Sequence, residues 1–176
     1  LLLLNNDIEC IEKNWLSELM QLAQGENVGL VGARLIFPYS NKIQHAGEVL
    51  GMGQLAASVY IGAPEHTKGA QNHLQVTREV SAIIGACQLI KKDLFFELGM
   101  LDEGDFKVVA NDIDLCLKVR AKNLLVLQTP FAKLWHHGSA SFNANNAEAR
   151  AQSLFTMSKD RRAFIQKWKH VLINDP

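Results

Sequence analysis

Polar side chains with catalytic potential follow apolar segments at three places in this sequence. The segments are Asn5-Asn6-Asp7, Asn111-Asp112-Ile113-Asp114 and Trp135-His136-His137. Carboxylates are ligands for Mg²⁺ or Mn²⁺ and can act as general bases, and a neutral imidazole can bind a metal ion. The three segments therefore contain the residue types that metal-assisted acid–base chemistry requires.

Each segment also has a structural interpretation. Asn5-Asn6-Asp7 consists of ordinary turn formers, and Asp112 and Asp114 can cap backbone N–H groups at the start of a helix. The two aspartates lie two positions apart and do not share a helix face, so they are not expected to bind one ion as a pair. Adjacent histidines in an extended segment point in opposite directions, so only one of His136 and His137 faces a given site. The residues alone leave both interpretations open.

Alternating strands and helices must position these side chains. The hydrophobic pattern predicts strands at residues 1–4, 28–37, 42–50, 80–90 and 124–127, and helices at 12–24, 92–98, from 111 and from 147. Thr129-Pro130 is expected to end the last strand, and residues 51–79 resemble a long surface loop. A continuous apolar run such as residues 1–4 is typical of a central parallel strand. We therefore expect an α/β fold with a mostly parallel sheet flanked by helices.

Composition excludes several classes of protein. The chain has 176 residues, of which 48% are hydrophobic, enough for a folded core rather than a disordered chain. Eighteen basic and eighteen acidic residues give zero formal net charge, so no global field attracts nucleic acid, and we expect no nucleic-acid partner. The longest run of purely apolar side chains has four residues, which is far too short to cross a bilayer.

The segment from residue 147 onward combines apolar and basic side chains at helical spacing. Such a helix can pack on the domain, bind a partner or lie on a membrane surface. Packing on the domain is the default expectation.

A resemblance to a known family adds to what the residue types indicate. It rests on six motifs in order: Leu3-Leu4-Asn5-Asn6-Asp7; Val31-Gly32-Ala33-Arg34-Leu35 leading to Ile43-Gln44-His45-Ala46-Gly47; Gly85-Ala86-Cys87-Gln88-Leu89-Ile90-Lys91-Lys92; Leu101-Asp102-Glu103; Asn111-Asp112-Ile113-Asp114-Leu115-Cys116-Leu117-Lys118; and Trp135-His136-His137. Across residues 1–141 the sequence resembles the family 2 glycosyltransferases of the GT-A fold. It is similar in particular to rhamnosyltransferase-like bacterial members that build surface polysaccharides.

The resemblance implies a site for a divalent metal ion. Asp7 matches the metal-binding carboxylate of the family's Asp-x-Asp motif, and Asn5 replaces the first aspartate while remaining able to bind a ribose hydroxyl or a metal-bound water. His136 resembles the downstream histidine that completes the metal site, and His137 is the second choice. An imidazole ligand favours Mn²⁺ over Mg²⁺, which prefers oxygen ligands.

The resemblance also implies how the reaction proceeds. Asp112 matches the general base of this inverting family, and Asn111 stands where the family often has glutamate. The small residues Gly85 and Ala86 allow a donor sugar to approach the backbone. His45 is expected to contact the acceptor or to support residues that do.

The match begins at the strand that carries Asp7, so the family's first, nucleotide-binding half is expected to be missing. On this interpretation residues 1–145 are the C-terminal portion of a GT-A catalytic domain, on its metal and acceptor side. Residues 146–176 are a helical extension. An exposed sheet edge where strands are missing would invite a homodimer. The alternatives are a non-catalytic sugar- or protein-binding module of the same fold and, less favoured, a metal-dependent hydrolase.

The implied partners follow from the family's reaction. They are a nucleotide-diphospho-sugar donor and a glycan or lipid-linked acceptor. The resemblance further implies a cytoplasmic location, with peripheral association at the inner face of the cell membrane.

Overall fold

The computed structural model describes residues 1–51, 55–138 and 147–172. Within them the helices are α1 (Trp15–Ala23), α2 (Lys92–Glu97), α3 (Asn111–Ala121) and α4 (Ala147–Leu172), with a 3₁₀ segment η2 (Ala70–Gln75). The strands are β1 (Leu2–Leu4), β2 (Ile8–Cys10), β3 (Val28–Phe37), β4 (Lys42–His45), β5 (Glu48–Leu50), β6 (Ala56–Ser58), β7 (Arg78–Glu79), β8 (Cys87–Ile90) and β9 (Leu125–His136). The expected boundary between residues 145 and 146 lies outside the described residues.

The architecture is mixed α/β and is built on one seven-stranded sheet. Its strand order is β1-β8-β3-β9-β2, with β4 paired to β3 and β7 paired to β9. β3 and β9 run parallel, whereas the other pairings of described strands are antiparallel. The α/β class is confirmed, and the expectation of a mostly parallel sheet is wrong.

Burial on both faces of the sheet explains that error. Along β3, Leu30 belongs to the hydrophobic cluster formed with α3, and Val31 belongs to the cluster formed with α1. A strand that is buried on both faces has a continuous apolar sequence whether it pairs parallel or antiparallel with its neighbours. The pattern therefore indicates burial and not strand direction.

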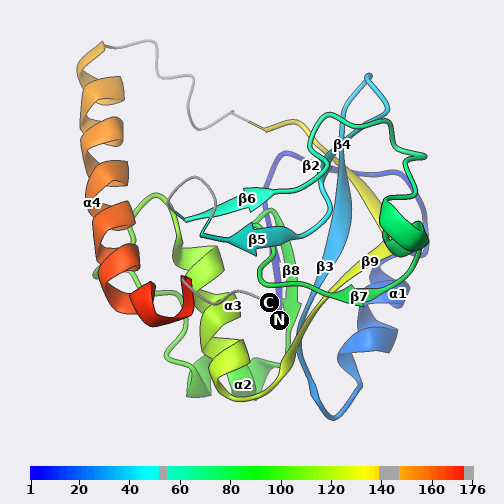
Figure 1. Ribbon diagram of the computed structural model, residues 1–176, viewed down its shortest axis with the longest axis horizontal. Coiled ribbons are helices and arrows are strands. Elements are labelled where there is room, and N and C mark those ends of the chain that lie inside the picture. Colours follow the sequence, from blue (N-terminus) through cyan, green and yellow to red (C-terminus); the bar gives the residue numbers. More distant parts are fainter. Residues whose placement is uncertain (52–54, 139–146, 173–176) are drawn as a thin grey trace.

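Helices cover the two faces unequally, as Figure 1 shows. Leu19 of α1 packs on one face with Leu35 and Leu134. The other face packs against α2, α3 and α4 in a larger cluster. A small β5–β6 hairpin lies between the main sheet and α4 in the view of Figure 1.

The first strand is not the central parallel strand that the sequence suggests. β1 lies at one end of the strand order and pairs antiparallel with β8, and both Leu1 and Leu4 are exposed. Its outer edge has no strand partner among the described residues. A homodimer through this edge remains a prediction.

Three further expectations about elements are corrected. The segment expected to be a loop contains β6, η2 and β7, and residues 80–90 form a strand only from Cys87. β9 continues through Pro130 to His136 instead of ending there. The β3–β9 register shifts between its Thr129 and Lys133 pairings, and such an irregularity accommodates a proline that cannot donate a backbone hydrogen bond.

The C-terminal helix packs on the domain. Phe164 and Trp168 are buried in the larger cluster, and Trp168 Nε1 donates to Asp114 Oδ1 at 2.8 Å. Asp160 Oδ2 accepts three backbone N–H groups, from residues 107–109, at 2.7–3.0 Å. Because Asp114 accepts the Trp168 hydrogen bond, it contacts α4. It does not cap the start of α3, contrary to the expectation from the sequence. No helix of the described residues is both long and apolar enough to cross a membrane.

Candidate active site

A pocket of about 700 Å³ lies where the end of β1, the segment before β8, the start of α3 and the β5–β6 hairpin meet. We call it the carboxylate pocket, because Glu48 and Asp112 line it. Predicted site residues gather here from distant parts of the chain: Asn5, Gly85, Ala86, Asn111, Asp112 and His136.

Asp7 and His136 form a close pair at this pocket. Asp7 Oδ1 lies 3.3 Å from His136 Nε2, and Asn5 Nδ2 lies at the same distance from that nitrogen. The antiparallel pairing of β2 with β9 brings the two segments together, and the His137 N–H donates to the carbonyl oxygen of Asp7. The sheet therefore places two of the predicted metal ligands side by side.

Gln44, which is not among the predicted site residues, fixes the tautomer of His136. Its Nε2 donates to the backbone carbonyl oxygen of His136 at 3.1 Å, which leaves Oε1 facing His136 Nδ1 at 2.7 Å. Because an amide oxygen only accepts, Nδ1 carries the ring proton and Nε2 of the neutral ring presents a lone pair toward Asp7. Burial lowers the pKa of His136, although Asp7 opposes that shift, and this favours the neutral ring.

This arrangement fits a divalent cation. A neutral Nε2 and a carboxylate oxygen are both acceptors, and two acceptors that face each other at 3.3 Å are stabilised by a cation between them. The described residues contain no group of three His, Cys, Asp or Glu side chains placed to hold a metal ion. Asp7 and His136 would therefore supply two ligands, and the remaining ligands would have to come from substrate or water.

Asp112 lies at the start of α3 and borders the pocket. Its Oδ2 accepts the Gly85 N–H at 2.6 Å and its Oδ1 accepts the Ile113 N–H at 2.9 Å. Burial nevertheless raises the pKa of Asp112, outweighing these hydrogen bonds. A raised pKa moves a carboxylate toward the range in which it is an effective general base.

Gly85 is needed for this contact. A Cβ at position 85 would lie 3.1 Å from the Cβ of Asp112, closer than side chains normally approach. The backbone N–H of Gly85 can reach the carboxylate because no side chain intervenes. Helix α3 begins at Asn111, after Ala110, which occupies the N-cap position in a left-handed conformation (φ 73°).

Glu48, which sequence reasoning missed, places a second carboxylate in the pocket wall. Its side chain is buried, and burial together with the negative charge of Asp112 outweighs a hydrogen bond from Ser58 and raises the pKa of Glu48 to about 7. The sequence held no signal for Glu48, because its burial is set by where β5 lies in the structure.

Two predicted histidines do not line the pocket. His45 is fully buried, its Nε2 accepts the Gly47 N–H, and burial lowers its pKa to about 3. His137 is exposed, and its Nε2 lies 3.3 Å from Glu9 Oε2. A role for either residue at the acceptor remains a proposal.

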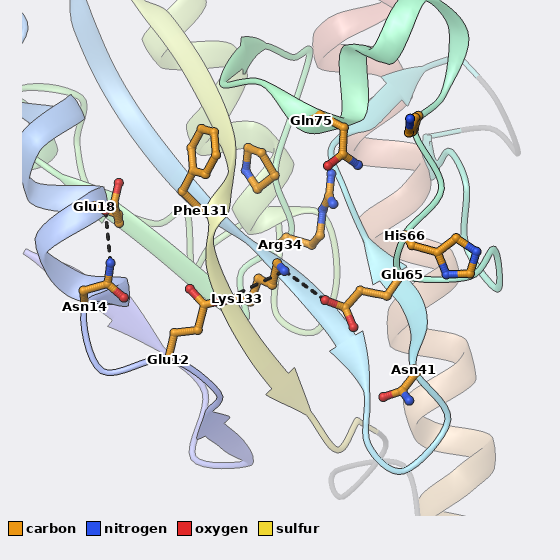
Figure 2. Close-up of a pocket in the computed structure, with 12 residues that line it drawn as sticks. Glu12, Asn14, Glu18, Arg34, Asn41, Glu65, His66, Gln75, Phe131 and Lys133 are labelled. Atoms are coloured by element: carbon orange, nitrogen blue, oxygen red, sulfur yellow. Dashed lines mark hydrogen bonds and ion pairs between the residues drawn. The ribbon is translucent and has the colours of Figure 1, made fainter.

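A second hollow of about 700 Å³ lies along the middle of β9, at residues 130–133, and is shown in Figure 2. We call it the ion-pair hollow: Lys133 Nζ lies 3.0 Å from Glu65 Oε1 and 3.8 Å from Glu12 Oε1. The buried Arg34 donates to the carbonyl oxygen of Leu74. None of the predicted site residues lines this hollow.

The sequence of this chain is similar to parts of known proteins. The chain is 44% identical over 139 residues, 79% of its length, to an uncharacterized protein y4gI of Sinorhizobium fredii (strain NBRC 101917 / NGR234). It is 38% identical over 146 residues, 82% of its length, to the O-antigen biosynthesis protein RfbC of Myxococcus xanthus. The chain spans only 15% and 11% of the lengths of these relatives. No family model matches it.

Proposed function

We propose that this chain carries the catalytic centre of an inverting glycosyltransferase of the GT-A type that acts in bacterial polysaccharide synthesis. The observation that carries the proposal is that Asp112 and His136 line one pocket, with Asp7 next to His136. The relative named for O-antigen biosynthesis supports the polysaccharide role. The substrates would be a nucleotide-diphospho-sugar and a glycan or lipid-linked acceptor.

The proposed chemistry begins at Asp112. As the acceptor hydroxyl oxygen attacks the anomeric carbon, a carboxylate oxygen of Asp112 takes the hydroxyl proton, and the bond from that carbon to the diphosphate breaks. The new glycosidic bond forms on the face opposite the leaving group, so the anomeric configuration inverts. The Gly85 N–H and the Ile113 N–H hold the carboxylate in place while the proton moves.

Asp7 and His136 would hold a divalent ion, Mn²⁺ in preference to Mg²⁺, which supplies positive charge to the departing diphosphate. Gln44 keeps the lone pair of His136 Nε2 directed toward Asp7. Asn5 lies within reach of the same nitrogen and can bind a donor hydroxyl. Asn111 lines the pocket beside the base.

Calorimetric titration of the chain with UDP, GDP and dTDP, each with Mn²⁺ and with EDTA, tests the proposal. Manganese-dependent binding of one nucleotide supports the transferase and names its donor class. The same titration is repeated on a longer protein that carries this sequence. If neither binds any nucleotide with manganese, the chain is better described as a non-catalytic module.

A further inference from the structure

Glu48 occupies a position that the proposed reaction leaves unexplained. The backbone N–H of Glu48 donates to the carbonyl oxygen of Ala82 at 2.9 Å, which fixes β5 against the segment that precedes Gly85. The residue is 7% exposed and still borders the carboxylate pocket together with Asp112. An ionisable side chain is rarely buried this deeply without a partner or a function.

A directed chain of hydrogen bonds holds the Glu48 carboxylate. His45 Nε2 accepts the Gly47 N–H at 3.2 Å, so the ring proton of the neutral imidazole lies on Nδ1, which faces Ser58 Oγ at 3.2 Å. The Ser58 hydroxyl in turn donates to Glu48 Oε1 at 2.9 Å. Each donor in the chain has one proton and directs it toward Glu48.

This chain orients the carboxylate without neutralising it. An ionised carboxylate has about four acceptor sites on its two oxygens, and Ser58 occupies one of them. The charge that acts on the pKa of Glu48 is that of Asp112, which is negative, and no cation is among the causes of the shift in the described residues. Arg161 of α4 borders the same pocket. Glu48 therefore retains acceptor capacity beside the proposed base.

The residues that line the pocket around Glu48 favour a sugar as the molecule that binds the remaining acceptor positions of its carboxylate. Leu55 and Ala56 line the pocket next to it, and Asn5 and Asn111 add amide groups. Apolar patches with a few convergent polar groups are typical of small-molecule sites, and a sugar ring combines apolar C–H faces with a rim of hydroxyl donors. The described residues place no third metal-binding side chain here that would favour an ion instead.

We propose that Glu48 is a sugar-binding residue of this pocket and that its carboxylate, oriented by Ser58 and His45, accepts a hydrogen bond from a hydroxyl of the transferred sugar. This inference rests on the proposed function, because a transferred sugar exists only if the chain is a transferase. Glu48 then selects the sugar, whereas Asp112 takes the acceptor proton.

The test compares each nucleoside diphosphate with its sugar conjugate in the presence of Mn²⁺. UDP and UDP-glucose, GDP and GDP-mannose, and dTDP and dTDP-rhamnose are titrated into the wild-type chain, and into a longer protein that carries this sequence, by calorimetry. The variants are Glu48→Gln, which keeps the side-chain shape, and Ser58→Ala, which removes only the orienting hydroxyl. Glu65→Gln, in the ion-pair hollow, is the matched control.

At pH 8, above the pKa of about 7 of Glu48, we expect Glu48→Gln to weaken binding of the nucleotide-sugar about 10-fold or more and to leave binding of the bare nucleoside diphosphate within about twofold, because a hydrogen bond to a charged group is lost at the sugar. Ser58→Ala should act in the same direction with a smaller effect. In ¹³C spectra recorded with diamagnetic Mg²⁺ in place of Mn²⁺, the Glu48 carboxyl resonance, assigned from its loss in Glu48→Gln, should move with the nucleotide-sugar and not with the nucleotide.

Equal binding of the nucleotide-sugar by wild type and Glu48→Gln would overturn the inference and leave the transferase proposal intact. Equal weakening of the nucleotide and its sugar conjugate would also overturn it, because that result describes a structural residue. If neither wild-type protein binds any nucleotide with manganese, the proposed function fails, and this inference fails with it.

Discussion

The carboxylate pocket and the ion-pair hollow each have a volume of about 700 Å³, but their acidic side chains differ in whether a cation lies next to them. In the ion-pair hollow, Lys133 lies between Glu65 and Glu12, so the acids have a cationic partner (Figure 2). In the carboxylate pocket, burial raises the pKa of both Asp112 and Glu48, and no cation is among the causes of either shift within the described residues.

If the proposed function holds, the environment of the carboxylates and not the volume of the hollow distinguishes the site. A carboxylate paired with lysine is stabilised in its charged form, which makes it a poor proton acceptor for catalysis near neutral pH. A carboxylate held by backbone N–H groups in a buried pocket keeps its geometry and binds a proton more readily.

The largest effect is expected at Asp112. Asp112→Asn should leave donor binding nearly intact and lower turnover by at least about 10²-fold, because only the proton acceptor is lost. Turnover and donor affinity are measured on a longer protein that carries this sequence, with Glu65→Gln as the control. Unchanged turnover in Asp112→Asn would remove this residue from the mechanism.

The next largest effect concerns the Asp7–His136 pair. Asp7→Ala and His136→Ala should each abolish the difference in nucleotide affinity between Mn²⁺ and EDTA. Gln44→Ala should weaken manganese-dependent binding about 10- to 100-fold, since it only orients the imidazole. Glu9→Gln alters the exposed His137–Glu9 pair, which has the same 3.3 Å separation, and should change nothing.

Calorimetry with and without manganese measures all four variants. If Asp7→Ala and His136→Ala retain the full manganese dependence, the ion is bound elsewhere. If Glu9→Gln loses it, the exposed His137–Glu9 pair and not the Asp7–His136 pair is the metal site.

Much of the fold could be predicted from the sequence where one local pattern decides the structure. The expected strand at residues 28–37 coincides with β3, and α2, α3 and α4 begin at the expected residues. Strand direction and the passage of β9 through Pro130 could not be predicted, because both depend on which strands pair across the sheet. Those pairings join residues about 100 positions apart.

The site divides in the same way. Asp7, Asp112 and His136 were selected by their resemblance to family motifs, and the structure places Asp112 and His136 on one pocket with Asp7 beside His136. Glu48 lies at the pocket because β5 is hydrogen-bonded to Ala82, and Gln44 contacts His136 because β4 approaches the end of β9. No local pattern contains such contacts, so these residues required the structure.

A smaller effect is expected in the pH dependence of stability. The pKa of Glu48 is about 7 in the folded state and 4.5 ordinarily, so the folded state binds more protons between these values. The free energy of unfolding should therefore fall as pH rises through this window, by on the order of 2 kcal/mol from this residue. Glu48→Gln removes that contribution.

Urea unfolding of wild type and Glu48→Gln at pH 5 and pH 7.5 measures this difference. The variant should gain stability relative to wild type at the higher pH, and the titration of His45 cancels because both proteins contain it. A stability difference that is the same at both pH values would show that Glu48 does not titrate as a buried group.

The smallest effect is expected in the ion-pair hollow. Lys133 and Glu65 are both partly exposed, and such pairs contribute at most about 1 kcal/mol. Lys133→Met should therefore change the free energy of unfolding by less than that and leave nucleotide and nucleotide-sugar binding unchanged. Loss of nucleotide binding in Lys133→Met, with manganese-dependent binding retained in Asp7→Ala and His136→Ala, would reverse the comparison. That result would place the donor in the ion-pair hollow, where lysine already pairs with the acidic side chains. Buried carboxylates without a neighbouring cation would then no longer indicate the proposed active site.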